Sequence, residues 1–79
     1  MNGMLVRDHM TLTIAADHYA YPAVRDQHAL EHLGMTPARF WQRVAWLLER
    51  PEVERERPRE VRRLRRLRDA RVAARARRG

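Results

Sequence analysis

The chain contains no cysteine, no serine and no lysine among its 79 residues. The absence of cysteine excludes disulfide bonds, thiolate zinc sites and cysteine nucleophiles, and the absence of serine removes a common hydroxyl nucleophile. Glycine is scarce as well, with three residues and no glycine-rich phosphate loop. We therefore predict that the protein is not an enzyme and needs no cofactor.

Long apolar runs are also missing. The run around Leu12–Ala16, for example, is far shorter than the roughly 20 residues that a membrane-spanning helix needs. The first ten residues lack a basic start followed by an apolar stretch, so we expect no signal peptide, no membrane contact and a cytoplasmic location. A chain of 79 residues has room for one small domain, which must be stabilised by helix packing.

All 17 basic residues are arginine, a bias typical of a high-GC genome such as that of an actinobacterium or its phage. Codon bias would raise arginine throughout the chain, but the charge is unevenly distributed. Residues 1–40 carry three arginines and four acidic residues, a net charge of −1, whereas residues 41–79 carry 14 arginines and six acidic residues, a net charge of +8. This asymmetry indicates an anionic partner for the C-terminal half.

Apolar periodicity and helix-boundary residues predict an all-α protein with four helical segments. The first spans roughly residues 11–19, where apolar side chains recur with the helical period. The second begins at Pro22, where a missing N–H has no cost, and ends at Leu33. Gly34 then supplies a left-handed cap.

The third segment has the clearest start, because Thr36 can cap the helix that Pro37 opens, and it should end before Pro51. The stretch "PEVERERP" is predicted to be a charged connector with room for a helical turn of its own. Pro58 opens the fourth helix, which runs toward Arg77 and is expected to fray at its end.

The stretch "LGMTP" joins the second and third helices through a short turn, with a glycine after one helix and a cap before the next. This is the sequence pattern of a helix-turn-helix. The predicted fold is therefore a small helix-turn-helix bundle of three to four helices with a basic C-terminal helix. We assign residues 1–56 to the helix-turn-helix core and residues 57–79 to the basic C-terminal helix or arm.

The third helix has one apolar and one polar side at about 100° per residue. The apolar arc contains Phe40, Trp41, Val44, Ala45, Leu47 and Leu48. Arg39, Gln42 and Arg43 lie opposite, near the helix start that enters the major groove in a helix-turn-helix. Their side chains suit guanine and adenine edges, so they are the candidates for base reading. The alternative is that they form only the solvated side of an amphipathic helix.

Trp46 does not fit this division, because it lies among the arginines. A large exposed indole is unusual on a monomer. We expect the fourth helix to fold back and cover Trp46 with Leu64 or Leu67. The alternative is that a partner surface covers it, which makes Trp46 a candidate for a protein contact.

The fourth helix carries a narrow apolar stripe, surrounded by arginines on all other sides. Val61, Leu64, Leu67 and Ala74 form the stripe. The arginines expected to point outward, toward phosphates, are Arg62, Arg63, Arg65, Arg66 and Arg68. Thr36 is a further phosphate-binding candidate. RNA, an acidic protein surface and an anionic membrane are alternative partners for this helix. The sequence favours nucleic acid over a protein or a membrane.

His28 and His32 are four residues apart on the second helix, a spacing that can bind zinc. No third ligand is evident in the sequence, so we predict no metal site and interpret both as ordinary helix residues.

The stretch "RDQHALEHLGMTPARFWQRVAWLLERPE", followed by "VRRLRRLRDAR", resembles a family of small actinobacterial and actinophage proteins, domain of unknown function 3263. The matching positions are Arg25–Gln27, Gly34–Thr36, Arg39–Gln42, Arg50–Glu52 and Val61–Arg68. Phe40 and Trp41 stand where the family pattern has two tyrosines. The resemblance implies a helix-turn-helix DNA-binding module and carries no assigned activity.

Together these features predict a helix-turn-helix protein that binds double-stranded DNA and regulates transcription in an actinobacterium or its phage. A helix-turn-helix this small often binds as a homodimer. The alternative function is a protein-interaction module that binds an acidic protein, such as a component of the transcription machinery.

Overall fold

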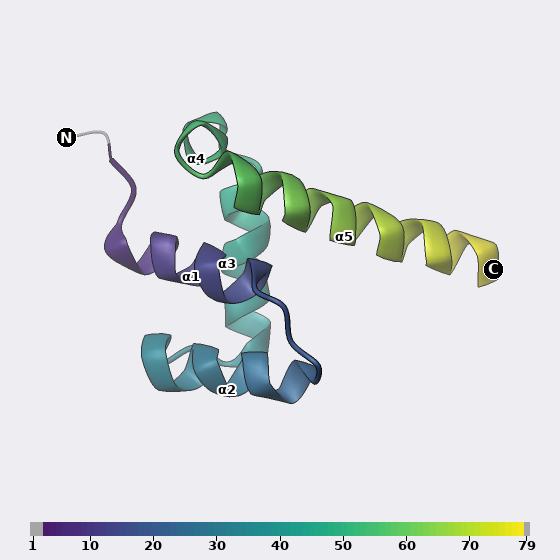
Figure 1. Ribbon diagram of the computed structural model, residues 1–79, viewed down its shortest axis with the longest axis horizontal. Coiled ribbons are helices and arrows are strands. Elements are labelled where there is room, and N and C mark those ends of the chain that lie inside the picture. The colour runs from purple at the N-terminus through teal and green to yellow at the C-terminus, as the bar shows by residue number, and fades with distance from the viewer. Residues whose placement is uncertain (1–2, 79) are drawn as a thin grey trace.

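The computed structural model describes residues 3–78 and contains five helices in that range (Figure 1). They are α1 (Val6–Ala16), α2 (Pro22–Leu33), α3 (Pro37–Leu48), α4 (Pro51–Glu56) and α5 (Pro58–Arg78). No strand occurs within these residues, so the predicted all-α bundle is confirmed. None of the described helices is long and apolar enough to span a membrane.

The corner between α2 and α3 forms as its residues predict. Gly34 ends α2 with φ 65° and ψ 25°, a left-handed conformation in which a side chain would be strained. Its N–H donates to the carbonyl of Leu30 at 2.9 Å. The Thr36 hydroxyl accepts a hydrogen bond from the N–H of Arg39 at 3.4 Å, and Pro37 is the first residue of α3.

The prediction for the first helix was wrong at both ends. α1 begins at Val6 rather than Thr11, and it ends at Ala16, so Tyr19 lies outside it. The first turn is polar and breaks the apolar pattern on which the prediction depended. This turn contains Asp8, which is buried in the bundle and accepts hydrogen bonds from Arg43, a residue distant in sequence.

The connector after α3, for which the sequence left room for a helical turn, forms the short helix α4, so the described residues hold more helices than the predicted three to four. Pro51 opens α4, and Val53 anchors it in the core with 2% of its surface exposed. α5 starts at Pro58 as predicted, and it stays helical through Arg78.

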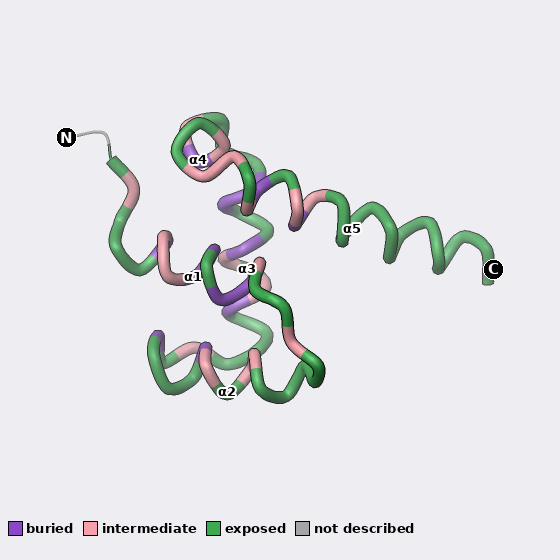
Figure 2. The backbone as a smooth tube through the Cα atoms, viewed as in Figure 1, coloured by how far each residue is buried: buried purple, intermediate pink, exposed green. Residues whose placement is uncertain are grey.

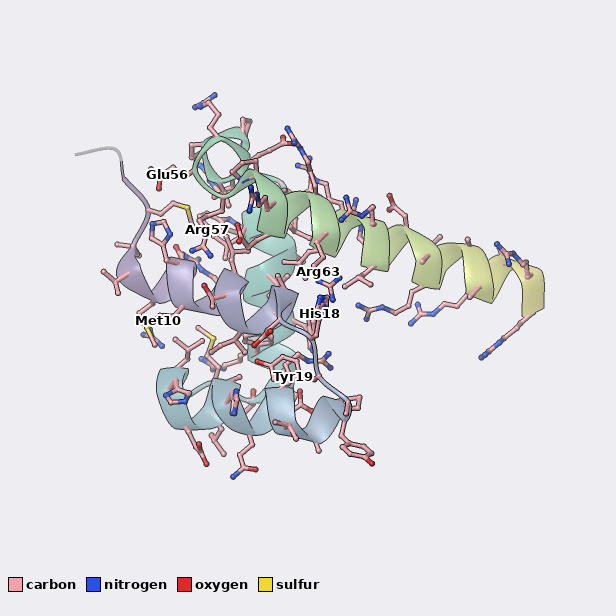
Figure 3. The ribbon with its side chains drawn as sticks, in the orientation of Figure 1. Met10, His18, Tyr19, Glu56, Arg57 and Arg63 are labelled. Carbon is pink, nitrogen blue, oxygen red and sulfur yellow. The ribbon has the colours of Figure 1, made fainter. Side chains whose placement is uncertain are left out.

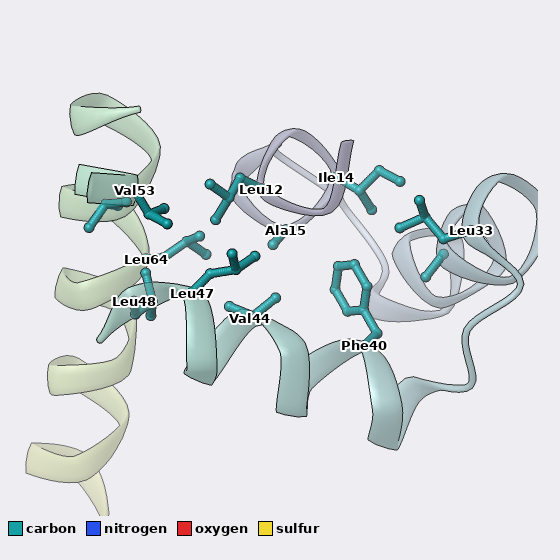
Figure 4. Packing of buried hydrophobic residues seen from close by; sticks show 12 residues of the cluster. Leu12, Ile14, Ala15, Leu33, Phe40, Val44, Leu47, Leu48, Val53 and Leu64 are labelled. Atoms are coloured by element: carbon teal, nitrogen blue, oxygen red, sulfur yellow. The ribbon is translucent and has the colours of Figure 1, made fainter. Parts of the chain in front are cut away.

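α3 runs through the middle of the bundle and contributes much of the core (Figures 1 and 4). Four members of its predicted apolar arc are buried, whereas Trp41 is half-buried and Ala45 is exposed at the edge. The core consists of Leu12, Ile14, Ala15, Ala29, Leu33, Phe40, Val44, Leu47, Leu48, Val53, Val61 and Leu64. All five helices contribute to it, so α3 is held from several sides.

Only the start of α5 packs into this core. Val61 and Leu64 are buried, whereas residues 66–78 are exposed (Figure 2). The helix has 21 residues and extends well beyond the other four, in a molecule that measures 45 × 28 × 19 Å (Figure 1). The core therefore uses residues from both the 1–56 and the 57–79 segments, and α5 becomes a free arm only after its first two turns.

Candidate nucleic-acid interface

A shallow recess lies at the corner between α2 and α3. It is lined by Arg7, Gly34, Met35, Arg39, Gln42, Arg43 and Trp46. The structure thus brings together the three predicted base-reading residues and Trp46. It adds Arg7 from α1, which the sequence pattern did not indicate, because α1 reaches this corner only through the tertiary fold.

Arg39 and Gln42 are exposed at the edge of this recess. Within residues 3–78, neither side chain has a hydrogen-bond or ion-pair partner. A free guanidinium can donate two hydrogen bonds to guanine, and a free amide can both donate to and accept from adenine. Thr36 lies one turn earlier; its hydroxyl oxygen accepts from the N–H of Arg39, and its own O–H remains available as a donor.

Arg43 is bound within the protein. Its Nε and one terminal nitrogen each donate to a carboxylate oxygen of Asp8, both at 2.8 Å. The Asp8 side chain is 9% exposed and that of Arg43 32% exposed. The hydrogen bonds to Asp8 hold the pKa of Arg43 above its already high ordinary value, so the guanidinium is permanently charged. The pair ties α1 to α3 and fixes one wall of the recess.

The expectation that Leu64 or Leu67 covers Trp46 was wrong. Trp46 is 45% exposed, and α5 packs against a different side of α3. Instead, the guanidinium of Arg43 lies 4.1 Å from the centre of the indole ring and that of Arg50 lies 4.5 Å from it. Cation–π contacts of this kind stabilise an indole that keeps part of its surface in water.

Two of the five arginines predicted to point outward from α5 point inward. Arg63 donates to the carbonyl of Ala16 at 2.6 Å, at the C-terminal end of α1, and also contacts His18 at 2.8 Å (Figure 3). Arg65 donates to the carbonyl of Leu48 at 2.6 Å, at the C-terminal end of α3. The last carbonyls of a helix lack partners within it and carry partial negative charge, which explains why guanidinium groups bind there.

The other three arginines of this set are exposed. Arg62 and Arg66 have no bonded partner in the described part of the chain. Arg68 is paired only loosely, at 3.8 Å from Glu49 and 3.4 Å from Asp69, and its side chain is 47% exposed. Ion pairs this exposed are weak, so phosphate can displace them.

Arg57 forms a polar cluster that the sequence did not reveal. It precedes α5 and donates to the Glu60 carboxylate at 3.2 Å, to the Thr13 hydroxyl at 2.9 Å and to the His9 carbonyl at 3.3 Å (Figure 3). These bonds fasten the start of α5 to α1. No local signal marks this residue, because its partners in α1 are more than 40 positions away.

His28 and His32 pack edge to face, with ring centres 5.7 Å apart, and the Tyr19 hydroxyl lies 3.4 Å from Nδ1 of His28. Among residues 3–78, no group of three metal-ligating side chains forms around them or elsewhere.

A family model described as "Protein of unknown function (DUF3263)" matches residues 3–76. The chain therefore belongs to this family, as the resemblance of residues 25–52 and 61–71 indicated. No curated protein and no solved structure matches the chain.

Proposed function

We propose that this member of the DUF3263 family binds double-stranded DNA and acts in transcriptional control. The observation that carries the proposal is the exposed pair of Arg39 and Gln42 on the first half of α3, beside the short α2–α3 turn, in a domain that also carries a basic arm. In this proposal α2 and α3 act as a helix-turn-helix, and the first half of α3 enters the major groove.

Base reading is assigned to Arg39 and Gln42, because both keep their donors free at the surface. Arg43 is assigned a positioning role instead. Two of its five N–H donors bond Asp8, and its contact with the Trp46 ring holds it against the helix. Its charge still adds to the positive potential that attracts DNA.

Phosphate binding is assigned to Thr36, Arg62, Arg66 and Arg68. Arg68 lies 3.8 Å from Glu49, the residue that follows the last residue of α3, so it lies beside the C-terminal end of that helix. Arg63 and Arg65 contribute charge, but each uses two of its three guanidinium nitrogens in contacts within the bundle.

The arginine bias of the sequence supports a high-GC source, either an actinobacterial or an actinophage gene, and the proposed place of action is the bacterial cytoplasm. A homodimer would place two copies of α3 in successive major grooves, about 34–36 Å apart. In that case the selected DNA sites would be two-fold symmetric.

Titration of labelled duplexes at several salt concentrations tests the proposal. Duplexes selected from a genomic pool should bind the full chain, with an affinity that falls linearly with the logarithm of salt concentration. Arg39→Ala should weaken binding to a selected site by about 1–3 kcal/mol and relax the sequence preference of the protein.

The phosphate contacts should respond differently from the reading contacts. Arg62→Gln and Arg66→Gln, made singly, should weaken all duplexes alike and reduce the salt slope by about 0.9 each. Arg55→Gln is the matched control, since it removes the same charge from the exposed surface of α4. Absence of binding at the lowest salt would refute DNA as the partner, and equal behaviour of the Arg39 and Arg62 variants would refute the division of roles.

A further inference from the structure

A second surface feature lies on the other side of α3, where the arm of α5 leaves the core. It is a groove of about 190 Å³ between the two helices. Its lining residues are Trp41, Val44, Ala45 and Leu48 from α3, and Leu64, Arg68, Arg71, Val72 and Arg75 from α5. The groove shares only Arg68 with the DNA-binding surface proposed above.

The floor of the groove is apolar and partly uncovered. Two apolar residues of the floor are open to solvent: Val72 is 59% exposed, and Ala45 is also exposed. Trp41 is half-buried at one edge, with the guanidinium of Arg25 at 4.7 Å and that of Arg71 at 5.6 Å from its ring centre. Exposed apolar surface bordered by charge is typical of a site that binds another protein.

The rim of the groove is positively charged along one stripe of α5. Arg68, Arg71 and Arg75 are spaced by three and four residues, so they lie on the same side of the helix. Arg68 has only its two loose ion pairs, and neither Arg71 nor Arg75 is paired with a carboxylate within residues 3–78. The groove therefore offers an apolar floor with three cationic groups along one wall.

We propose that this groove binds an acidic amphipathic helix from another protein. Apolar residues at positions i, i+3, i+4 and i+7 of that helix would occupy the floor, and carboxylates beside them would pair with the α5 arginines. From Leu64 to Arg75 the groove wall is roughly 16 Å long, which matches a helix of about three turns. The bound helix would lie between α3 and α5 and extend the bundle.

Neither DNA nor a second copy of this chain suits the groove as well. DNA offers little apolar surface besides the thymine methyl group, so it would leave the floor in contact with water. A second copy carries a net charge of +7 and would bring arginine against arginine. An acidic helix satisfies the floor and the rim together.

A synthetic peptide tests this inference. The probe is a three-turn helix with leucine at positions i, i+3, i+4 and i+7 and glutamate on both flanks. It is titrated into the full chain carrying Trp46→Phe, so that Trp41 is the single remaining tryptophan. We expect a saturable blue shift of Trp41 emission and an affinity that weakens with salt. A peptide with glutamine in place of glutamate should bind roughly tenfold more weakly or worse.

Matched variants distinguish peptide binding in the groove from nonspecific binding elsewhere on the surface. The double variant Ala45→Gln, Val72→Asn makes the floor polar without changing the net charge or the buried core. It should lower the affinity for the peptide by roughly tenfold or more. Val6→Asn makes a similar change on a 74% exposed residue of α1 and should leave peptide affinity unchanged. No saturable shift, or equal binding by the floor variant and the wild type, would overturn the proposal. The proposal would also be overturned if sedimentation showed that the change in Trp41 emission comes from self-association of the chain. The same holds if anionic vesicles, and not the peptide, produced the change.

Duplex titration of the same floor variant keeps the two proposals apart. Its DNA affinity should stay within about twofold of wild type, because the change leaves Arg39, Gln42 and all α5 arginines in place. Peptide binding without DNA binding would refute the proposed function alone, and DNA binding without peptide binding would refute only the groove.

Discussion

Replacing Asp8 with asparagine should lower the free energy of unfolding by about 2 kcal/mol. Each oxygen of the Asp8 carboxylate accepts a hydrogen bond from Arg43 at 2.8 Å, and charge-assisted bonds of this kind contribute about 1.5–3 kcal/mol each. Asparagine can keep one of them as a neutral acceptor. Arg43 is 32% exposed and can regain water, so the loss falls in the lower part of the range for the one bond that is removed.

Thermal unfolding followed by circular dichroism measures this effect. For a domain of this size, 2 kcal/mol corresponds to a decrease in Tm of roughly 8–16 °C. The variant should still fold, because an ordinary chain of 79 residues is stable by about 4–12 kcal/mol. Urea titration should show a lower midpoint with an unchanged slope.

Asp69→Asn is the control for the same chemical change at an exposed site. Its side chain is 71% exposed and lies 3.4 Å from Arg68, so its loss should change stability by no more than about 0.5 kcal/mol. Asp8→Leu combined with Arg43→Met should be less destabilising than either change alone, because it leaves no unpaired charge. A Tm for Asp8→Asn within about 2 °C of wild type would refute the reasoning, since α1 would then be held by its apolar face alone.

Two further predictions concern the bonds that α5 makes with the bundle. Arg65→Gln should destabilise the protein by about 1 kcal/mol in urea titration, because it removes the donor to the Leu48 carbonyl, whereas Arg62→Gln should change stability by less than about 0.5 kcal/mol. The hydrogen bond from Arg57 lowers the pKa of Glu60 below its ordinary value of 4.5. The stability that this carboxylate contributes is present above 4.5 and is lost as the pH falls through its lower folded-state pKa, so Glu60→Gln should flatten the acid side of the stability–pH curve.

The α2–α3 corner could be predicted because its causes are local. A glycine cap, a threonine cap and prolines at the helix starts act through backbone geometry within a few residues. The start of α1 could not be predicted in this way. Its first turn is polar, and it is stabilised by Asp8 reaching Arg43, 35 positions along the chain.

The arginines of α5 show the same limit within one helix. Arg65 follows the buried Val61 by four residues, so its place beside the apolar stripe was accessible to helical periodicity. Arg63 precedes the stripe residue Leu67 by four residues, but Leu67 is exposed, and Arg63 reaches the Ala16 carbonyl only because α1 ends beside it. The sequence alone does not distinguish neighbouring arginines such as Arg62, which has no bonded partner within residues 3–78, and Arg63, which is bonded to the bundle.

Arginines that form hydrogen bonds within the bundle are less available to a partner than their number suggests. The C-terminal ends of α1, α2 and α3 each receive a guanidinium from another helix, through Arg63, Arg7 and Arg65. These contacts satisfy carbonyls that would otherwise lack partners, in a domain without covalent cross-links. A net charge of +7 therefore overstates the surface open to phosphate. In an arginine scan, losses of stability and losses of DNA affinity should thus arise at different positions, even between adjacent residues of α5.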